Sequence, residues 1–182
     1  MYMKATGIVR RIDDLGRVVI PKEIRRTMRI REGDPLEIFI SREGEVIFKK
    51  YSAMKDMNGI MQIFADSFSK FTGRPVAVCD GDSIVAVSGI SKKEYVDHTV
   101  SDGITELMIR RRDFLRRPGV SSKIPLISDN NNLFCDMVCP IISESDCVGA
   151  LISISPENGD LPDEKHFEVC KSYASIIGKQ ME

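Results

Sequence analysis

The chain has 182 residues, of which 42% are hydrophobic and 29% are charged, and its formal net charge is -1. No apolar run approaches the roughly 20 residues that cross a bilayer and no signal-peptide pattern is present, so we expect a cytoplasmic protein with no membrane partner. The charge is divided unevenly, because residues 1–52 carry twelve Lys and Arg against eight Asp and Glu, whereas residues 53–182 carry fourteen against nineteen. The basic excess of the first segment indicates nucleic acid as a partner, and the acidic remainder argues against a second DNA-wrapping surface.

Two short β-type runs, residues 7–12 and 17–20, lie on either side of an Asp-Asp-Leu-Gly turn, and Pro21 then marks the start of a short helix over residues 21–28. Seven arginines within 22 residues lie on or beside these turns: Arg10, Arg11, Arg17, Arg25, Arg26, Arg29 and Arg31. A guanidinium group carried on a stiff strand or helix presents one fork geometry to phosphate oxygens or to a guanine edge. This arginine density favours a DNA contact surface over a solvated charged face.

A β-hairpin is predicted next, with strands at residues 36–40 and 46–48 and a turn at residues 42–45. Four short strands and one short helix in about fifty residues bury too little surface to be stable alone, so we expect a second copy to complete a barrel. Such pairing would place two copies of the arginine set on one side, as a twofold-symmetric reader of double-stranded DNA requires.

Four stretches of residues 1–52 carry a resemblance to a known family: Lys4-Ala5-Thr6-Gly7-Ile8-Val9-Arg10-Arg11, Leu15-Gly16-Arg17-Val18-Val19-Ile20-Pro21, Glu23-Ile24-Arg25-Arg26 and Leu36-Glu37-Ile38. This segment resembles the swapped-hairpin DNA-binding domain of the AbrB-type transition-state regulators. The resemblance implies an intertwined dimer that binds DNA, with Arg10, Arg17, Arg25 and Arg26 as contact residues. It places Arg11, Lys22 and Arg29 in the same zone, where the alternative is an exposed helix face or an ion pair with a nearby carboxylate, Asp13, Asp14 or Glu23.

A second domain is expected from residue 53 to residue 182, because the apolar period changes at the join near residues 49–52. The spacing of six side chains then becomes helical: Met54, Met57, Met61, Phe64, Phe68 and Phe71. Such a stripe either packs on the sheet of its own domain or forms a helix bundle between subunits, and the sequence leaves both alternatives open.

Two hairpins and two further helices are predicted in this domain. The expected ranges are strands 75–79 and 83–88, helix 103–117 ending at Pro118-Gly119, strands 134–142 and 147–153, and helix 162–181. They predict an antiparallel sheet with helices on one face. The whole chain is therefore expected to be α+β, with an N-terminal swapped-hairpin barrel followed by this sheet and its flanking helices.

The element order, together with Val138-Cys139-Pro140-Ile141 and Val148-Gly149-Ala150-Leu151, resembles a GAF domain, a small-molecule sensing and dimerising module. The resemblance implies a ligand between the sheet and residues 91–130, and a tetramer assembled through this domain and its helices. No ligand motif is recognised in residues 91–130, so no cofactor is predicted. Sensing of an unidentified small-molecule effector and a purely oligomerising role remain open.

The five cysteines, Cys79, Cys135, Cys139, Cys147 and Cys170, are expected to be reduced core residues. The alternative is a redox sensor, if Cys135, Cys139 and Cys147 converge across one hairpin. His98 and His166 are far apart with no metal-ligand spacing, so we expect surface residues and no metal site.

A second group of arginines, residues 110–112 with 116 and 117, allows three interpretations. Most simply, they form the solvated side and C-terminal end of a helix, where cations interact favourably with the macrodipole. Alternatively, one or two of them turn inward to hold an anionic ligand, or they touch DNA.

Enzymes are disfavoured by the absence of a nucleophile elbow, a phosphate-binding glycine loop, a metal set and a catalytic carboxylate pair. An antitoxin or scaffold that binds another protein is the remaining alternative, since some antitoxins share the swapped-hairpin domain and bind a toxin through a disordered acidic tail. The apolar periodicity beyond residue 53 is unlike such a tail. We therefore expect a homo-oligomeric, DNA-binding transcription regulator, acting as an activator, a repressor or both.

Overall fold

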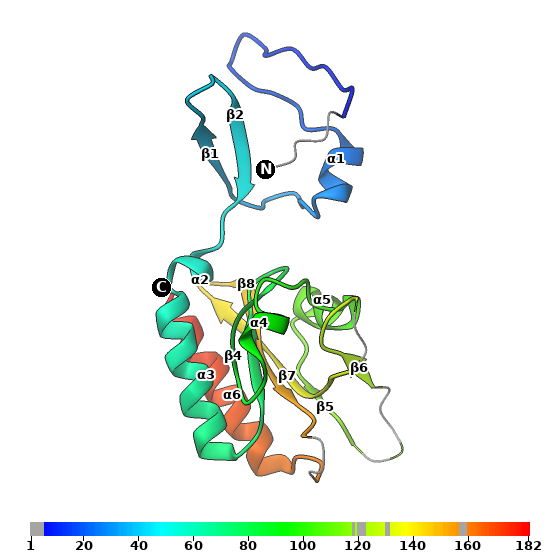
Figure 1. Ribbon diagram of the computed structural model, residues 1–182, viewed down its shortest axis with the longest axis vertical. Helices are drawn as coiled ribbons and strands as arrows, with labels where there is room; N and C mark the ends of the chain where they lie inside the picture. The colour runs from blue at the N-terminus through cyan, green and yellow to red at the C-terminus, as the bar shows by residue number, and fades with distance from the viewer. Residues whose placement is uncertain (1–5, 118, 120–122, 130–131, 157–159) are drawn as a thin grey trace. The chain divides into compact units, whose positions relative to one another are not determined.

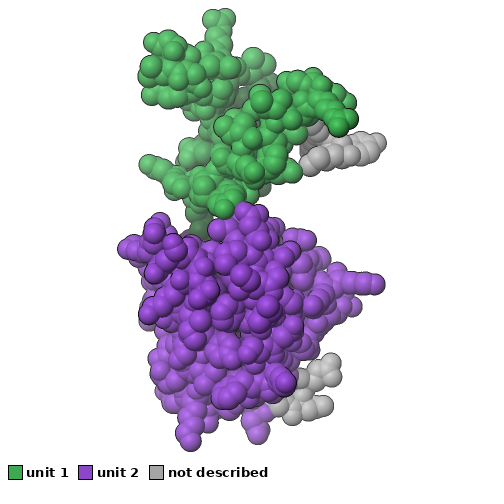
Figure 2. Space-filling model, turned by 90° about the vertical axis from the view of Figure 1, so that its left-hand side faces the viewer, with its two compact units in different colours: residues 1–51 green, residues 52–182 purple. Residues whose placement is uncertain are grey.

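The computed structural model describes residues 6–117, 119, 123–129, 132–156 and 160–182. The chain divides into two compact units, unit 1 from Met1 to Tyr51 and unit 2 from Ser52 to Glu182 (Figure 2). Lys4 and Ala5 of the family string lie outside the described residues. In the part of the chain that the structure describes, no helix is both long and apolar enough to span a membrane.

Unit 1 contains one short helix and one hairpin (Figure 1). Helix α1 is Lys22–Thr27, and strands β1 (Leu36–Ile40) and β2 (Val46–Lys50) pair antiparallel with Ile38 opposite Phe48. These elements confirm the predicted helix and hairpin, and β2 runs two residues further than predicted.

The predicted strands at residues 7–12 and 17–20 are wrong for a single chain, since no strand occurs among the described residues before β1. The turn between them does form, with Asp13 N 3.1 Å from Arg17 O and Gly16 N 3.0 Å from Asp13 O. Gly7, at the start of the first run, has φ 68°, which lies outside the β region, and the bonds of the turn do not continue into a ladder among the described residues.

The described residues of unit 1 include no buried side chain. Large apolar side chains are instead open to solvent, with Val9 84%, Val19 72% and Ile40 80% exposed. The described part of unit 1, residues 6–51, therefore has no hydrophobic core of its own within one chain.

Unit 2 is built on a six-stranded sheet in the order β4-β3-β8-β7-β5, with β6 also paired to β7. The strands are β3 (Val76–Cys79), β4 (Ile84–Ser88), β5 (Phe114–Leu115), β6 (Ile124–Pro125), β7 (Phe134–Ser143) and β8 (Asp146–Ile154). All of these pairs are antiparallel. Both predicted hairpins are confirmed, whereas the short strands β5 and β6 were not predicted.

Helices cover both faces of this sheet, so the prediction of helices on one face is wrong. They are α2 (Ala53–Asp56), α3 (Asn58–Thr72), α4 (Lys92–Tyr95), α5 (Asp102–Arg110) and α6 (Glu164–Lys179). Helices α3 and α6 lie side by side on one face, where Phe68 and Ile177 are buried (Figure 1). On the other face, Tyr95 from α4 and Ile104 from α5 join a second core. The reason is visible in β3, whose four side chains are all buried and therefore need cover on both sides.

The helical stripe that starts at Met54 packs mainly on the sheet of its own unit. Met54, Met61 and Phe68 are fully buried, and Met57 and Phe64 are partly buried against the same core. Phe71 does not join them, since it is 72% exposed. The interpretation as a core-packing stripe is thus confirmed for five of the six positions.

The predicted helix over residues 103–117 ends earlier, because α5 stops at Arg110. Its cap residue Arg111 adopts a left-handed conformation with φ 51°, which no α-helix continues through. Phe114 and Leu115, which fit the helical spacing, instead form β5 against β7. The predicted stop at Pro118 lies outside the described residues, and the last helix, α6, is confirmed.

Two glycines permit close backbone approaches in unit 2. A Cβ atom at Gly178 of α6 would lie 2.0 Å from Ile142 O, and one at Gly149 of β8 would lie 2.1 Å from Cys79 O. Only glycine fits such distances, so these residues let α6 and β3 sit directly against their neighbours.

Candidate nucleic-acid interface

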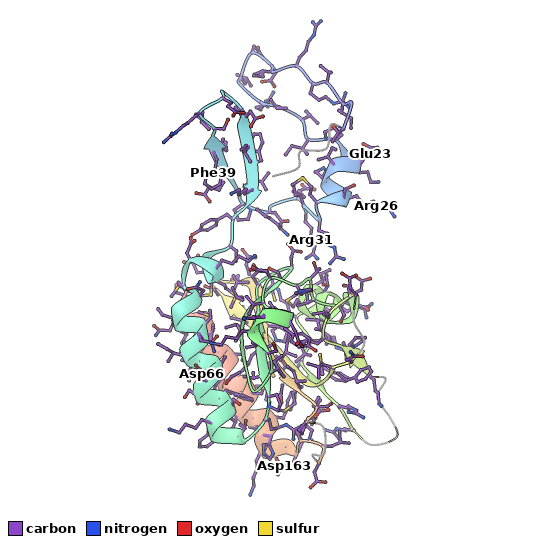
Figure 3. The ribbon with its side chains drawn as sticks, viewed as in Figure 1. Glu23, Arg26, Arg31, Phe39, Asp66 and Asp163 are labelled. Atoms are coloured by element: carbon purple, nitrogen blue, oxygen red, sulfur yellow. The ribbon has the colours of Figure 1, made fainter. Side chains whose placement is uncertain are left out.

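The backbone around α1 is fixed by a left-handed cap. Arg29 has φ 51°, and the N–H of Ile30 donates to Arg25 O at 2.7 Å while that of Arg29 donates to Arg26 O at 3.2 Å. These bonds satisfy carbonyls that a helix end leaves without partners. Figure 3 shows Glu23 and Arg26 on α1. The arginines of α1 and its cap are therefore carried on an ordered backbone.

A half-buried ion pair between Lys50 and Asp34 joins the hairpin to the turn after α1. Asp34 accepts from Lys50 Nζ at 2.9 Å and from Arg31 N at 2.8 Å. The same Lys50 ammonium donates to Arg29 O at 3.1 Å. Lys50 at the end of β2 thus ties two points of the post-helix turn together, Arg29 and Asp34. Sequence reasoning missed this role, because nothing in the spacing of Asp34 and Lys50 indicates that they meet.

The turn at residues 13–16 is organised by one carboxylate. Asp13 Oδ1 accepts from Leu15 N at 3.1 Å and from Arg17 N at 2.7 Å, while Asp13 Oδ2 accepts from Arg17 Nε at 2.7 Å. Bonds from the Arg17 backbone and then from its side chain hold the pKa of Asp13 below its ordinary value of 3.8. The Arg17 side chain nevertheless stays 70% exposed.

The seven predicted contact residues fall into two groups. Arg10, Arg11 and Arg17 flank the turn at residues 13–16, whereas Lys22, Arg25, Arg26 and Arg29 lie in α1 or at its end. Six of the seven are exposed, and Arg25 is half-buried. Of the ion pairs considered in the sequence, Asp13 forms one with Arg17 rather than with Arg11, Lys22 or Arg29. The arginine set is therefore accessible to a large anionic partner.

The second arginine group contains both solvated side chains and one that turns inward. Arg110 pairs with Glu106 at 2.6 Å, one helical turn away, and Arg117 pairs with Glu164 at 2.6 Å. Both pairs are exposed, as expected of solvated side chains. Arg116 instead turns inward, where its Nη1 lies 3.1 Å from Asp136 Oδ1. The anion that it holds is therefore a carboxylate of the protein itself.

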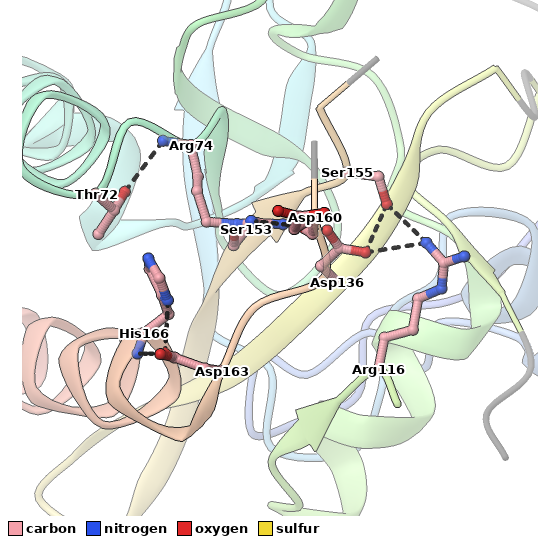
Figure 4. Close-up of polar contacts among 9 residues, drawn as sticks. All are labelled: Thr72, Arg74, Arg116, Asp136, Ser153, Ser155, Asp160, Asp163 and His166. Atoms are coloured by element: carbon pink, nitrogen blue, oxygen red, sulfur yellow. Dashed lines mark hydrogen bonds and ion pairs between the residues drawn. The ribbon is translucent and has the colours of Figure 1, made fainter. Parts of the chain in front are cut away.

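Arg116 belongs to a buried polar network at one end of the sheet (Figure 4). Asp136 of β7 is 1% exposed, and its two carboxylate oxygens pair with Arg74 Nη2 and Arg116 Nη1. Ser155 Oγ donates to Asp136 Oδ1 at 2.6 Å, and Arg74 Nη1 donates to Asp160 O at 2.9 Å. This network ties four separate segments of unit 2 together. Sequence reasoning missed it, although an acidic residue inside the apolar run 134–142 was a usable signal.

The five cysteines, all within the described residues, are not in disulfides, and all except half-buried Cys147 are buried. Cys139 packs with Cys170 on the α3–α6 side of the sheet, whereas Cys135 and Cys147 pack on the opposite side. The hypothesis that residues 135, 139 and 147 converge is therefore wrong. Burial raises the pKa of Cys79 and of Cys135, which disfavours the reactive thiolate.

The two histidines lie apart. His98 is exposed, as predicted, while His166 is half-buried with Nδ1 2.6 Å from Asp163 Oδ1. Asp163 also accepts from His166 N at 2.9 Å, which caps the start of α6. His166 thus contacts the N-cap residue of α6 through both its backbone and its ring.

Comparison with known proteins places the chain in a family. The family described as "Stage V sporulation protein T C-terminal, transcription factor" matches residues 56–182. Stage V sporulation protein T of Bacillus subtilis (strain 168) is 44% identical over 181 residues, 99% of this chain and 99% of that protein. The chain belongs to the stage V sporulation protein T family. It is accordingly a transcription regulator.

The first segment has relatives of its own. Transition state regulatory protein AbrB of Bacillus subtilis (strain 168) is 61% identical over 51 residues, which are 28% of this chain and 52% of that protein. The family described as "Antidote-toxin recognition MazE, bacterial antitoxin" matches residues 9–56. The resemblance to the AbrB-type regulators is confirmed.

Solved structures establish the fold of the larger unit. The GAF domain of Thermosynechococcus elongatus PixJ in its blue-light absorbing form matches with a TM-score of 0.53 at 14% identity, over 72% of this chain and 89% of its own. The GAF domain/HD domain protein from Geobacter sulfurreducens matches with a TM-score of 0.50 at 13% identity, over 73% and 98%. At such identities the likeness concerns fold alone, and it confirms the GAF-like sheet predicted for residues 53–182.

Proposed function

We propose that residues 1–52 are a DNA-binding domain through which the chain regulates promoters of late sporulation genes in the cytoplasm. Arg10, Arg17, Arg25 and Arg26 make the principal contacts, and Arg11, Lys22 and Arg29 support them. The observation that carries the proposal is a set of accessible arginines on an ordered turn and helix, within a segment 61% identical to AbrB. No catalytic role is proposed.

Pairing of two copies of unit 1 is the second part of the proposal. Within one chain this unit leaves Ile38, Ile40 and Val46 at least 60% exposed, and apolar surface of this kind is normally buried. A partner chain would also supply neighbours for residues 7–12 and 17–20, which form no strand in the single chain. A swapped-hairpin dimer accounts for both features.

Residues 53–182 then form a GAF-like domain that joins dimers into a tetramer. The surface of α3 and α6 supports this, because Ile63 is 68%, Phe71 72% and Ile176 47% exposed. On the opposite side of the sheet, Ile104 and Met108 of α5 are buried in one core cluster with Leu126. We therefore favour oligomerisation over effector sensing; residues 118, 120–122 and 130 of the expected ligand segment lie outside the described residues.

The alternative, an antitoxin-like protein that binds another protein, is supported only by the match of the MazE antitoxin family to residues 9–56. Against it stands the folded unit 2 with its two cores, in place of a disordered toxin-binding tail.

The test is fluorescence anisotropy of the full chain with a promoter-length duplex across a salt series. If a dimer engages about eight phosphates, the slope of log K against log salt should be about -7. Arg17→Ala should cost about 1–3 kcal/mol of binding free energy. Arg42→Ala is the matched control, since Arg42 is an exposed arginine of unit 1 outside the set. Absence of binding at low salt, or equal losses in both variants, would contradict the proposal.

A further inference from the structure

A carboxylate lies within the arginine set, which is unexpected for a surface that binds a polyanion. Asp13 and Arg17 are four residues apart across the turn, and the Asp13 side chain makes three short contacts there. Two of these, to backbone N–H groups at Oδ1, build the turn. The third, from Arg17 Nε to Oδ2 at 2.7 Å, does not involve the backbone N–H donors and acts on the guanidinium alone.

This third contact has a specific chemical consequence. A guanidinium carries five N–H groups in a rigid plane, one on Nε and two on each Nη. With Nε occupied by Asp13, the plane is held by one edge and the Nη groups retain donors for another acceptor. An arginine that is already oriented loses less conformational freedom when it binds.

We propose that Asp13 is a positioning residue for DNA binding, whose carboxylate orients the Arg17 guanidinium for contact with a phosphate or a guanine edge. The inference rests on the proposed function, because it requires Arg17 to be a contact residue. It assigns to an acidic side chain a favourable effect on the binding of a polyanion. This favourable effect is the opposite of what charge repulsion alone would produce.

Simple electrostatics makes the opposite prediction. A carboxylate close to DNA repels phosphate, so its removal should tighten binding if Asp13 acted only as a charge. At 0.15 M salt the screening length is about 8 Å, which weakens this repulsion but leaves the direct contact to Arg17 intact. The positioning role predicts weaker binding after the same change.

The decisive variant is Asp13→Asn in the full chain. An asparagine keeps one carbonyl oxygen for the N–H groups of Leu15 and Arg17, so the turn is retained, but its amide group cannot accept from Arg17 Nε. We expect a duplex-binding affinity about 2- to 12-fold lower at 0.15 M salt, the range typical of ordering one flexible side chain. Asp14→Asn is the charge-matched control and should leave the affinity unchanged or raise it.

A double-variant cycle tests whether Asp13 acts through Arg17. If it does, Asp13→Asn should have no further effect once Arg17→Ala is present. NMR of the arginine Nε–H group supplies a readout without DNA, since Arg17 should show a more mobile Nε–H in Asp13→Asn.

The outcomes separate the inference from the proposed function. If Arg17→Ala weakens binding while Asp13→Asn leaves it unchanged or tightens it, the positioning role is overturned and the DNA-binding role stands. If Arg17→Ala leaves the duplex-binding affinity unchanged, the assignment of Arg17 as a contact residue is wrong, and the positioning role of Asp13 is overturned with it. A loss of equal size in the presence and absence of Arg17 would show that Asp13 serves only the turn, which also overturns the inference.

Discussion

Removing the negative charge of Asp136 should be among the most damaging single changes in unit 2. Asp136→Asn keeps the shape of the side chain but leaves Arg74, whose side chain is 8% exposed, as a buried cation without its counter-ion. Breaking a buried ion pair from one side typically costs about 3–5 kcal/mol. For residues 52–182 the entropy of unfolding is about 0.27 kcal/mol/K, so the midpoint of thermal unfolding should fall by about 11–18 °C.

Thermal and urea unfolding followed by circular dichroism measure this loss directly. Asp160→Asn is the control, because Asp160 joins the network through its backbone carbonyl while its side chain is exposed. A double variant, Arg74→Met with Asp136→Leu, should recover part of the loss since it removes both buried charges. Changes that disturb no buried charge typically alter the free energy of unfolding by about 1 kcal/mol or less. If the free energies of unfolding of Asp136→Asn and the Asp160→Asn control differ by no more than that, the reasoning is refuted.

Three further changes test other parts of the molecule. Gly178→Ala should destabilise unit 2 by about 1–3 kcal/mol or more, because its new methyl group meets sheet backbone. Gly59→Ala, in open space on α3, should instead stabilise it by about 0.4–1 kcal/mol, and urea unfolding distinguishes the two signs. Lys50→Met should weaken duplex binding more than Lys49→Met, because Lys50 bonds to the turn after α1. Fluorescence anisotropy at one salt concentration measures both losses, and equal losses would show that only the charge matters. With Ellman's reagent, Cys147 should react first in the folded protein, and a second fast thiol would contradict the burial of the other four.

Much of unit 2 was predictable because its turns are formed by hydrogen bonds between residues close together in the sequence. Asp80 accepts from the N–H groups of Asp82 at 2.8 Å and Ser83 at 2.7 Å, so the Asp-Gly-Asp signal corresponds to a real turn between β3 and β4. The helical spacing from Met54 likewise predicted a buried face, because apolar residues recur at the helical period where one face of a helix packs on the core. Arginines at the surface of unit 1 were also predictable, because charged side chains are rarely buried.

The failures have physical reasons that no local pattern contains. Phe114 and Leu115 fit a helix by spacing, yet the left-handed Arg111 ends α5 and pairing with β7 takes over. The contact between Arg74 and Asp136 joins residues 62 apart, which sequence spacing does not predict. Residues 7–12 and 17–20 have the apolar pattern of strands, yet only the turn between them forms. In each case long-range contact decides between locally acceptable alternatives.

The two arginine–carboxylate sites illustrate how one chemical pair serves different ends according to burial. Around Asp136, paired charges hold four segments of unit 2 together, and the side chains of Arg74 and Arg116 are only 8% and 21% exposed. At Asp13, the Arg17 side chain is 70% exposed, so the pair contributes little to stability and leaves the guanidinium accessible. Arginine content alone therefore does not identify a nucleic-acid interface. What distinguishes the Asp13–Arg17 site is that the guanidinium stays exposed while the same carboxylate also accepts the backbone bonds that build the turn.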